Sequence, residues 1–265
     1  MTYLSVKRGL ETILDSASQQ QLEDLRHLII EELRKRYPSN EPRYGNLSRS
    51  FSEDELARFY NAIENPKYAL LFKCQSFLGL RIGEAVALKV TDIRHDTREL
   101  VLITEKSRKL DRVFIPSGLY SDLCSYISRN EGEIESHRGY LFFPDPSARS
   151  FGDHITSHRA GVLFRRAAKK AGILEVYGYS QEKGRVPRPL HRLTTHSHRH
   201  YSITTFYKAS KDLVLTNKYA RHSMGNYRDT MRYDGTDRSE MYRIHEAAFS
   251  TGMKQKRISV LQEKL

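Results

Sequence analysis

The stretch from Leu56 to Leu88 constrains the fold more than any other, because its apolar residues recur at the spacing of a helix face. The segment Glu64-Asn65-Pro66 and then Gly79 interrupt this pattern, and proline and glycine are residues that end helices. Just before the stretch, Ser52 and Glu55 have the spacing of a capping box. We therefore expect a helix to begin after Ser52 and two or three consecutive helices to fill the stretch.

Helical periodicity continues along much of the remaining chain, but two short segments read as strands instead. These are Leu100–Thr104 and Arg112–Ile115, and the polar segment Glu105–Asp111 between them predicts a β-hairpin loop. The Gly- and Pro-rich segment Tyr177–Pro189 predicts a loop, and residues 130–155 are expected to be rich in loops. Further helices are expected near 119–127, 158–170, 201–209, 213–222 and 239–249. The fold class is therefore mostly α with a small antiparallel β-sheet (α+β).

The net charge of the chain limits the classes of partner that it can bind. The 265 residues include 44 Lys and Arg against 32 Asp and Glu, which gives a formal net charge of +12. This sign favours a polyanion, because each neutralised phosphate releases counterions. Charge alone does not separate DNA from RNA or an anionic membrane, but the absence of Trp makes a membrane the least favoured of the three. Two cysteines, Cys74 and Cys124, cannot form a disulfide framework, so we expect a reducing, cytoplasmic compartment.

Three regions are expected along the chain. Residues 1–46 form a short helical N-terminal arm, residues 47–249 form the main domain, and residues 250–265 form a tail. In the arm, apolar residues at helical spacing predict an amphipathic helix within Gln19–Arg36, and a shorter helix is expected over Val6–Leu14. Two helices bury little surface by themselves, so the arm is expected to pack on the main domain, a partner subunit or DNA.

The segment Gly79-Leu80-Arg81-Ile82-Gly83-Glu84 places an arginine directly after an apolar stretch that is expected to be buried. An arginine there needs a carboxylate or phosphate partner, and Glu84 follows nearly one helical turn later. A surface Arg–Glu pair is the simpler alternative. Lys106 and Lys109 lie in the hairpin loop, where lysines are usually solvated, although a loop lysine can also reach a DNA groove and donate a proton.

The run Leu190–His200 is rich in histidine and allows three interpretations. The histidines are solvated surface residues in the first. In the second, His196 and His198 lie on one face of a strand and bind a metal with another histidine of the run, but no nearby Cys or His-Glu-x-x-His pattern supports this. In the third, His196 and Arg199 lie on one face of a helical turn and converge on one phosphate. Basic residues that fit a surrounding backbone-binding surface are Arg165, Arg185, Arg188 and Arg192.

Taken in order, these motifs resemble the tyrosine recombinase (phage integrase) family over about residues 48–248. The resemblance is carried by Arg81 within Gly-Leu-Arg-Ile-Gly-Glu, Lys106, His196-Ser197-His198-Arg199-His200, Arg221-His222-Ser223 and Met231-Arg232-Tyr233. The segment Leu141-Phe142-Phe143-Pro144 and the basic helix ending in Lys170-Ala171-Gly172-Ile173 also fit that family. Each motif is weak alone, whereas five in this order across one domain are specific.

The resemblance implies a mostly helical tyrosine-recombinase-like catalytic domain that breaks and rejoins DNA. Tyr233 would attack the scissile phosphorus, leaving a 3′-phosphotyrosyl bond and a free 5′-hydroxyl. Arg81 and Arg199 would hold the non-bridging oxygens. The resemblance assigns protonation of the 5′-oxygen to Lys106, help in taking the tyrosine proton to His196, a hydrogen bond to the phosphate to His222, and orientation of Arg81 or its neighbour to Glu84. Because the covalent link keeps the phosphodiester energy, no metal or other cofactor is expected.

The sequence departs from the family pattern in four places. His198 stands where the family usually has an apolar residue. Arg221 replaces the usual glycine, so this helix end is expected to contact DNA. The spacing from His222 to Tyr233 is about two residues longer than usual, a change that a loop can absorb, and it leaves Tyr227 as a second candidate nucleophile. The N-terminal arm is shorter than the usual N-terminal DNA-binding domain.

The main hypothesis is a site-specific recombinase or integrase that acts on mobile, plasmid or viral double-stranded DNA, in a prokaryotic or viral context. It is expected to recognise a specific target site and to assemble on it as a homo-oligomer. DNA-binding roles are expected for Lys109, Arg165, Arg188, Arg192 and Arg221. The alternatives are a metal-dependent rolling-circle nickase or relaxase, a type IB topoisomerase, and a non-catalytic basic DNA-binding protein. The target sequence, the direction of the reaction and the choice between cis and trans cleavage stay open.

Overall fold

The computed structural model of the chain describes residues 16–36, 48–104, 109–145, 152–180, 188–221 and 238–255. The chain divides into two compact units, one of Met1–Arg43 with Tyr177–Leu190 and one of Tyr44–Val176 with His191–Leu265. The predicted features that lie outside the described residues are Lys106, Arg185, His222, Tyr227, Tyr233 and the helix over Val6–Leu14.

The smaller unit contains helix α2 (Gln19–Arg36), whose bounds are those of the predicted amphipathic helix. It also holds most of a two-stranded sheet formed by β4 (Val176–Tyr179) and β5 (Pro189–His191). The prediction of a loop over Tyr177–Pro189 was therefore wrong at both of its ends. Pro189 is tolerated because it is the first residue of its strand, where a missing N–H interrupts the ladder least.

The larger unit begins with the three helices α3 (Glu53–Asn61), α4 (Pro66–Leu78) and α5 (Ile82–Val86). The capping box at Ser52 is confirmed, since Ser52 N–H donates to Glu55 Oε2 at 2.9 Å and Glu55 N–H donates to Ser52 Oγ at 3.2 Å. Gly79 ends α4 in the left-handed conformation, with a φ of 60°. The helical prediction for this stretch is thus confirmed, including its breaks.

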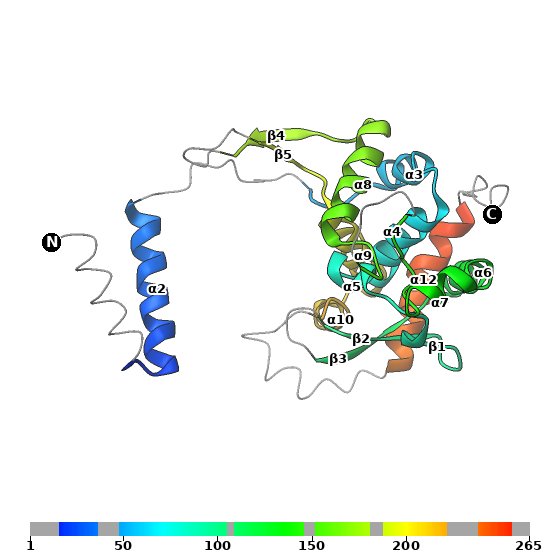
Figure 1. Ribbon diagram of the computed structural model, residues 1–265, viewed down its shortest axis with the longest axis horizontal. Coiled ribbons are helices and arrows are strands. Elements are labelled where there is room, and N and C mark those ends of the chain that lie inside the picture. Colours follow the sequence, from blue (N-terminus) through cyan, green and yellow to red (C-terminus); the bar gives the residue numbers. More distant parts are fainter. Residues whose placement is uncertain are drawn as a thin grey trace. The chain divides into compact units, whose positions relative to one another are not determined.

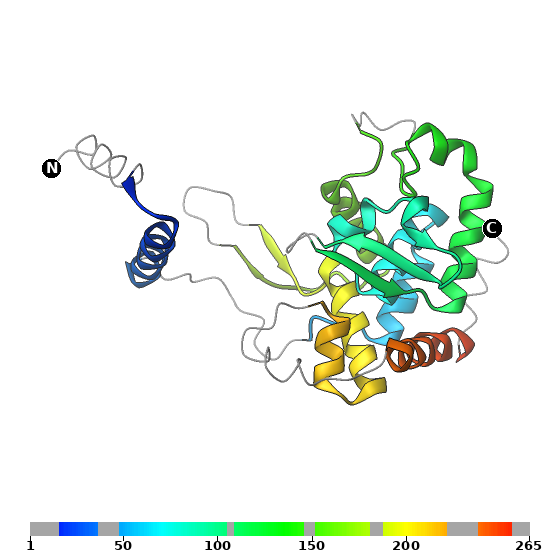
Figure 2. The ribbon, with the colours of Figure 1, turned by 90° about the horizontal axis from the view of Figure 1, so that it is seen from below.

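A three-stranded sheet in the order β1-β2-β3 lies on one side of the helices of this unit (Figure 2). It follows the short 3-10 helix η1 (Val90–Asp92), and its strands are β1 (Ile93–Arg94), β2 (Glu99–Ile103) and β3 (Leu110–Phe114). The central pairing is antiparallel, with Val101 opposite Arg112, which confirms the predicted hairpin. The two-residue β1 was not predicted, because it is too short to show an alternating pattern.

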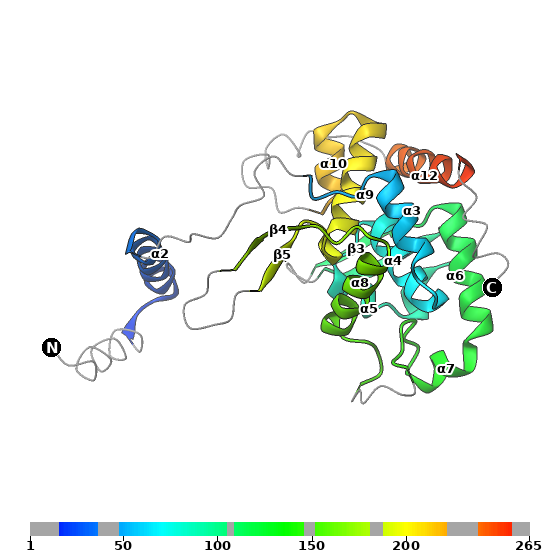
Figure 3. The same cartoon turned by 90° about the horizontal axis from the view of Figure 1, so that it is seen from above.

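The remaining helices of the larger unit are α6 (Ser117–Arg129), α7 (Glu131–Ser136), α8 (Ser157–Lys170), α9 (Thr195–Ser210), α10 (Leu213–Tyr219) and α12 (Arg238–Gln255). Figures 1 and 3 show α9 beside α4, and α9 also packs against α10 and α12. Helix α7 lies in the region expected to be loops. Helix α9 begins before its predicted start, so His196, His198 and His200 of the histidine-rich run lie in its first turns. None of the described helices combines the length and apolar character needed to cross a membrane.

Candidate active site

Arg81 and Glu84 form a tight local pair at the start of α5. Glu84 Oε2 accepts the backbone N–H of Arg81 at 2.8 Å, and Glu84 Oε1 accepts Arg81 Nη1 at 3.0 Å. The Glu84 side chain is 1% exposed, whereas that of Arg81 is 21% exposed. The pair is therefore not a solvated surface pair. Its carboxylate is buried, and its guanidinium keeps an open side.

Arg199 is a buried arginine that is held by the ends of two other helices. It is 2% exposed, and it donates from Nη1 to the carbonyl oxygen of Gly79 and from Nη2 to that of Ala220. Gly79 and Ala220 are the C-caps of α4 and α10, where carbonyl oxygens lack helical partners and carry partial negative charge. Burial, with the nearby charges of Arg221 and Arg81, lowers the Arg199 pKa to about 10. The guanidinium is still charged at neutral pH.

Arg221 reaches the same place from the end of α10. Its Nη2 donates to Gly79 O at 3.0 Å and to Glu84 Oε2 at 2.9 Å, and its side chain is 5% exposed. The fold thus brings Arg81, Arg199 and Arg221 together around one buried carboxylate and one helix end. The sequence predicted a phosphate site at Arg81 and Arg199, but it contained no signal that Arg221 would share Glu84 with Arg81.

His196 lies in the first turn of α9, three residues before Arg199. Its residue surface is exposed, and its ring packs edge-on against His200 with the centroids 4.8 Å apart. Desolvation of the ring, followed by the charges of its neighbours His200, Arg199 and Arg81, lowers the His196 pKa to about 4. The imidazole is therefore neutral at pH 7, and a neutral imidazole can accept a proton.

His198 faces the opposite way, into the aromatic core. It is 0% exposed, it stacks on Phe72 with the centroids 5.1 Å apart, and its Nδ1 lies 2.7 Å from Ser76 Oγ. His196 and His198 consequently cannot converge on one metal ion. In the described part of the chain, no three His, Cys, Asp or Glu side chains are grouped as a metal site requires.

The basic residues that were predicted to bind DNA differ in their surroundings. Lys109, Arg165 and Arg188 are exposed, and Arg165 lies on α8. Arg192 is only 12% exposed, because it forms ion pairs with Glu55 and with Glu175 and donates to the Ser48 carbonyl oxygen. Its guanidinium is already engaged within the protein.

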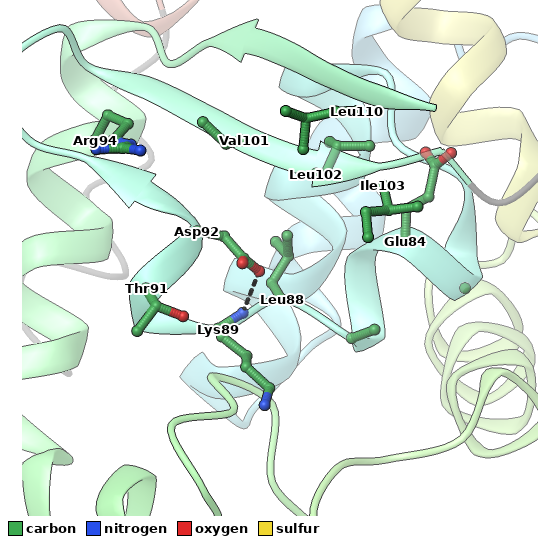
Figure 4. Close-up of a pocket in the computed structure, with 12 residues that line it drawn as sticks. Glu84, Leu88, Lys89, Thr91, Asp92, Arg94, Val101, Leu102, Ile103 and Leu110 are labelled. Atoms are coloured by element: carbon green, nitrogen blue, oxygen red, sulfur yellow. Dashed lines mark hydrogen bonds between the residues drawn. The ribbon is translucent and has the colours of Figure 1, made fainter. Parts of the chain in front are cut away.

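A pocket of about 550 Å³ opens between α5 and η1 on one side and β2 and β3 on the other (Figure 4). Glu84 stands at its edge near Ile103, and Asp92 Oδ2 accepts the backbone N–H of Lys89 at 2.8 Å within it. Ile103 and Leu110 are 65% and 69% exposed at its rim. Ile103 and Leu110 flank the loop of Lys106 in the sequence, and Glu84 binds Arg81 and Arg221. The pocket therefore adjoins both the end of the hairpin and the cluster of Arg81, Arg199 and Arg221.

Comparisons with known proteins agree with this arrangement. Tyrosine recombinase XerH of Campylobacter jejuni is 28% identical over 193 residues, which are 68% of this chain and 47% of that protein. The chain therefore spans about half the length of this curated relative. The integrase of mycobacterium phage Brujita has a TM-score of 0.55 at 15% identity, over 81% of this chain and 66% of that one. XerH site-specific recombinase bound to palindromic difH substrate, in a post-cleavage complex, has a TM-score of 0.52 at 21% identity, over 76% and 52%.

The structural likenesses show a shared fold, and the sequence itself matches the phage integrase family over residues 49–239. This match covers most of the chain and includes α3 to α10. It agrees with the resemblance expected from the ordered motifs, so the chain is a member of the phage integrase family of tyrosine recombinases.

Proposed function

We propose that this protein is a site-specific DNA recombinase that cleaves and rejoins DNA through a 3′-phosphotyrosyl intermediate. The observation that carries the proposal is the convergence of Arg81 and Arg199, which come from different helices and meet beside Gly79 and Glu84. A purely structural ion pair needs one arginine for one carboxylate. A cluster with an excess of guanidinium groups suits a phosphodiester, whose charge increases in the pentacovalent transition state.

The described residues support distinct parts of this chemistry. Arg199 is fixed by two helix ends, so it can donate to a non-bridging phosphate oxygen without first being ordered. Arg81 presents its open side to the same place while Glu84 holds its other side. His196, neutral at pH 7, can accept the proton of an attacking phenol.

The residues that complete the reaction are proposed from the family motifs. The phenol oxygen of Tyr233 would form a bond to phosphorus as the bond to the 5′-oxygen breaks. Lys106 would give that oxygen its proton, and His222 would donate to the phosphate. Rejoining reverses these steps: a 5′-hydroxyl attacks phosphorus and Tyr233 leaves. The phosphodiester energy is retained throughout, so no cofactor is required.

The partner we propose is double-stranded DNA that contains a specific target site. Support comes from the net charge of +12 and the exposed Lys109, Arg165 and Arg188. The XerH structure holds a palindromic substrate, and a palindrome presents the same half-site twice. We therefore propose that this chain also assembles as a homo-oligomer on its DNA.

Covalent capture tests the proposal. The purified protein is incubated in EDTA with nicked duplexes that cover the DNA around its own coding sequence, and the products are separated in SDS. We expect a protein–DNA adduct that Tyr233→Phe abolishes while leaving DNA binding intact. Tyr227→Phe is the matched control and should retain the adduct. An adduct that survives Tyr233→Phe but not Tyr227→Phe would identify Tyr227 as the nucleophile.

The same experiment separates the alternatives. Loss of cleavage in EDTA, or a 5′-linked product, would indicate a relaxase, whose use of His196 and His198 as paired ligands conflicts with the burial of His198. Relaxation of supercoiled DNA of any sequence would indicate a type IB topoisomerase. Salt-dependent binding with no adduct on any duplex would indicate a non-catalytic DNA-binding protein.

A further inference from the structure

Arg221 has hydrogen-bond donors that no described part of the chain satisfies. Its Nη2 donates to Gly79 O and Glu84 Oε2, but its Nε and Nη1 are buried and have no hydrogen-bond partner among the described residues. A buried donor without an acceptor destabilises a folded protein by roughly 1–3 kcal/mol. Two such donors on one guanidinium indicate a group that awaits an acceptor.

The charges around Arg221 are also unbalanced. The guanidinium groups of Arg81, Arg199 and Arg221 surround the single carboxylate of Glu84. Arg199 pairs with two neutral carbonyl oxygens, and no other carboxylate forms an ion pair with these three arginines in the described part of the chain. Two positive charges are therefore left over in a largely buried site, which an anion would neutralise.

The backbone at Arg221 is strained as well. Its φ is +50°, in the left-handed region that side chains other than glycine adopt at some cost. Glycine would fit this position without strain, and it is also the residue that the family usually has there. The presence of an arginine against the preference of the backbone indicates that its guanidinium contributes something that a glycine does not.

We propose that Arg221 is a third arginine of the phosphate site, which donates from Nε and Nη1 to a non-bridging oxygen of the scissile phosphodiester. This inference rests on the proposed function. Arg199 Nη1 and Arg221 Nη2 already donate to the same oxygen, that of Gly79, so the two guanidinium groups are close enough to share one oxyanion. Arg221 would thus give the phosphate a positive charge and directed hydrogen bonds. A glycine at this position supplies neither.

Arg221→Gly tests the inference, and the chain offers a matched control. Arg138 also has a left-handed φ, +55°, but its side chain is 79% exposed and forms an ion pair only with Asp153 among the described residues. Both substitutions relieve backbone strain, so both variants should fold. We expect Arg221→Gly to slow formation of the covalent adduct about 10- to 100-fold. Arg138→Gly should react at the wild-type rate. Arg221→Lys keeps the positive charge but loses the forked donor geometry of the guanidinium. Its rate of adduct formation should lie between those of Arg221→Gly and wild type.

A second measurement does not depend on cleavage. The melting temperature is followed in inorganic phosphate and in sodium chloride of equal ionic strength, so that general salt effects appear in every variant. The melting temperatures of wild type and Arg138→Gly should rise more in phosphate than that of Arg221→Gly. Equal gains in all three, or equal adduct rates for Arg221→Gly and wild type, would overturn the inference. If wild type forms no adduct but Arg221→Gly alone loses its phosphate gain, the recombinase proposal fails while the anion site at Arg221 stands.

Discussion

The backbone carbonyl of Gly79 accepts a hydrogen bond from Arg199, a residue 120 positions later in the chain. The same carbonyl accepts Arg221 Nη2 at 3.0 Å, so one peptide group sets the separation of two guanidinium groups. It can do so because α4 ends there, which leaves the oxygen without a helical partner. The position of a helix end is thereby tied to the geometry of the candidate active site.

Gly79→Ala should consequently impair both folding and reaction. A Cβ at this φ of +60° would lie 3.2 Å from Ser202 Oγ and 3.5 Å from the Tyr219 hydroxyl. We expect a loss of about 2–3 kcal/mol in the free energy of unfolding, from backbone strain and crowding together. Gly172→Ala is the control, because Gly172 has a φ of +67° but nothing within 4 Å of its added Cβ.

Urea denaturation of the two glycine variants measures the difference. Gly172→Ala should lose only about 1 kcal/mol, the contribution of strain alone. Adduct formation should fall in Gly79→Ala and stay unchanged in Gly172→Ala. Equal stabilities would contradict the contacts that surround Gly79.

Glu84→Gln should destabilise the fold more than a typical charge removal. The Glu84 carboxylate is 1% exposed and receives Arg81 and Arg221, so its neutral form leaves two arginines facing each other without a counter-charge. We expect a loss of about 3 kcal/mol in the free energy of unfolding. Glu64→Gln is the control: Glu64 is 82% exposed and pairs with Lys170, so its loss should stay within about 0.5 kcal/mol. A loss that small in Glu84→Gln would mean that the cluster is well hydrated.

Signals that are local in sequence predicted much of this fold. The capping box at Ser52, the break at Gly79 and the helical spacing between them each depend on residues within a few positions. The order of the motifs, through the family resemblance, predicted that Arg81 and Arg199 would lie together, and the fold brings both beside Gly79 and Glu84, while their role at a phosphate stays a prediction. Short elements such as β1 and α7 escaped prediction, because two to six residues do not establish a period.

Features that depend on tertiary contacts could not be predicted. The ion pair between Arg221 and Glu84 joins residues 137 positions apart, and no pattern in either segment marks it. His198 lies between polar residues of a histidine-rich run, and only the packing of α9 against the aromatic core shows that it is buried. Arg192 reads as a surface cation, but the fold surrounds it with Glu55 and Glu175.

Acid should destabilise the protein through two buried histidines. Burial lowers the pKa of His198 to about 3 and that of His245 to about 4, from 6.5 in the unfolded chain. As the pH falls, the unfolded state binds these protons before the folded state does. The contribution of the neutral histidines to stability is therefore fully present above pH 6.5 and is lost as the pH drops toward the folded pKa values. From pH 7 to pH 5, each histidine should remove about 2 kcal/mol from the free energy of unfolding.

The histidine assignment is checked with His198→Phe, which retains a ring among the neighbouring aromatic side chains. Its unfolding free energy should fall by about 2 kcal/mol less than that of wild type between pH 7 and pH 5. His158→Phe, at an exposed position on α8, should keep the full wild-type pH dependence. Identical slopes in all three proteins would mean that His198 is not a neutral core residue.

Arg192 and Arg165 should separate stability from DNA affinity. Arg192 is held by Glu55, Glu175 and the Ser48 carbonyl, so Arg192→Ala leaves a carboxylate that is 17% exposed without its cation. We expect it to lower the free energy of unfolding by about 2 kcal/mol, with little change in the salt dependence of DNA binding.

Arg165 is exposed on α8. Arg165→Ala should keep wild-type stability, but the slope of log affinity against log salt for a mixed-sequence duplex should fall by about 1. If Arg192→Ala instead changes that slope and leaves stability intact, Arg192 exchanges its protein partners for phosphate when DNA binds, as the sequence alone suggested.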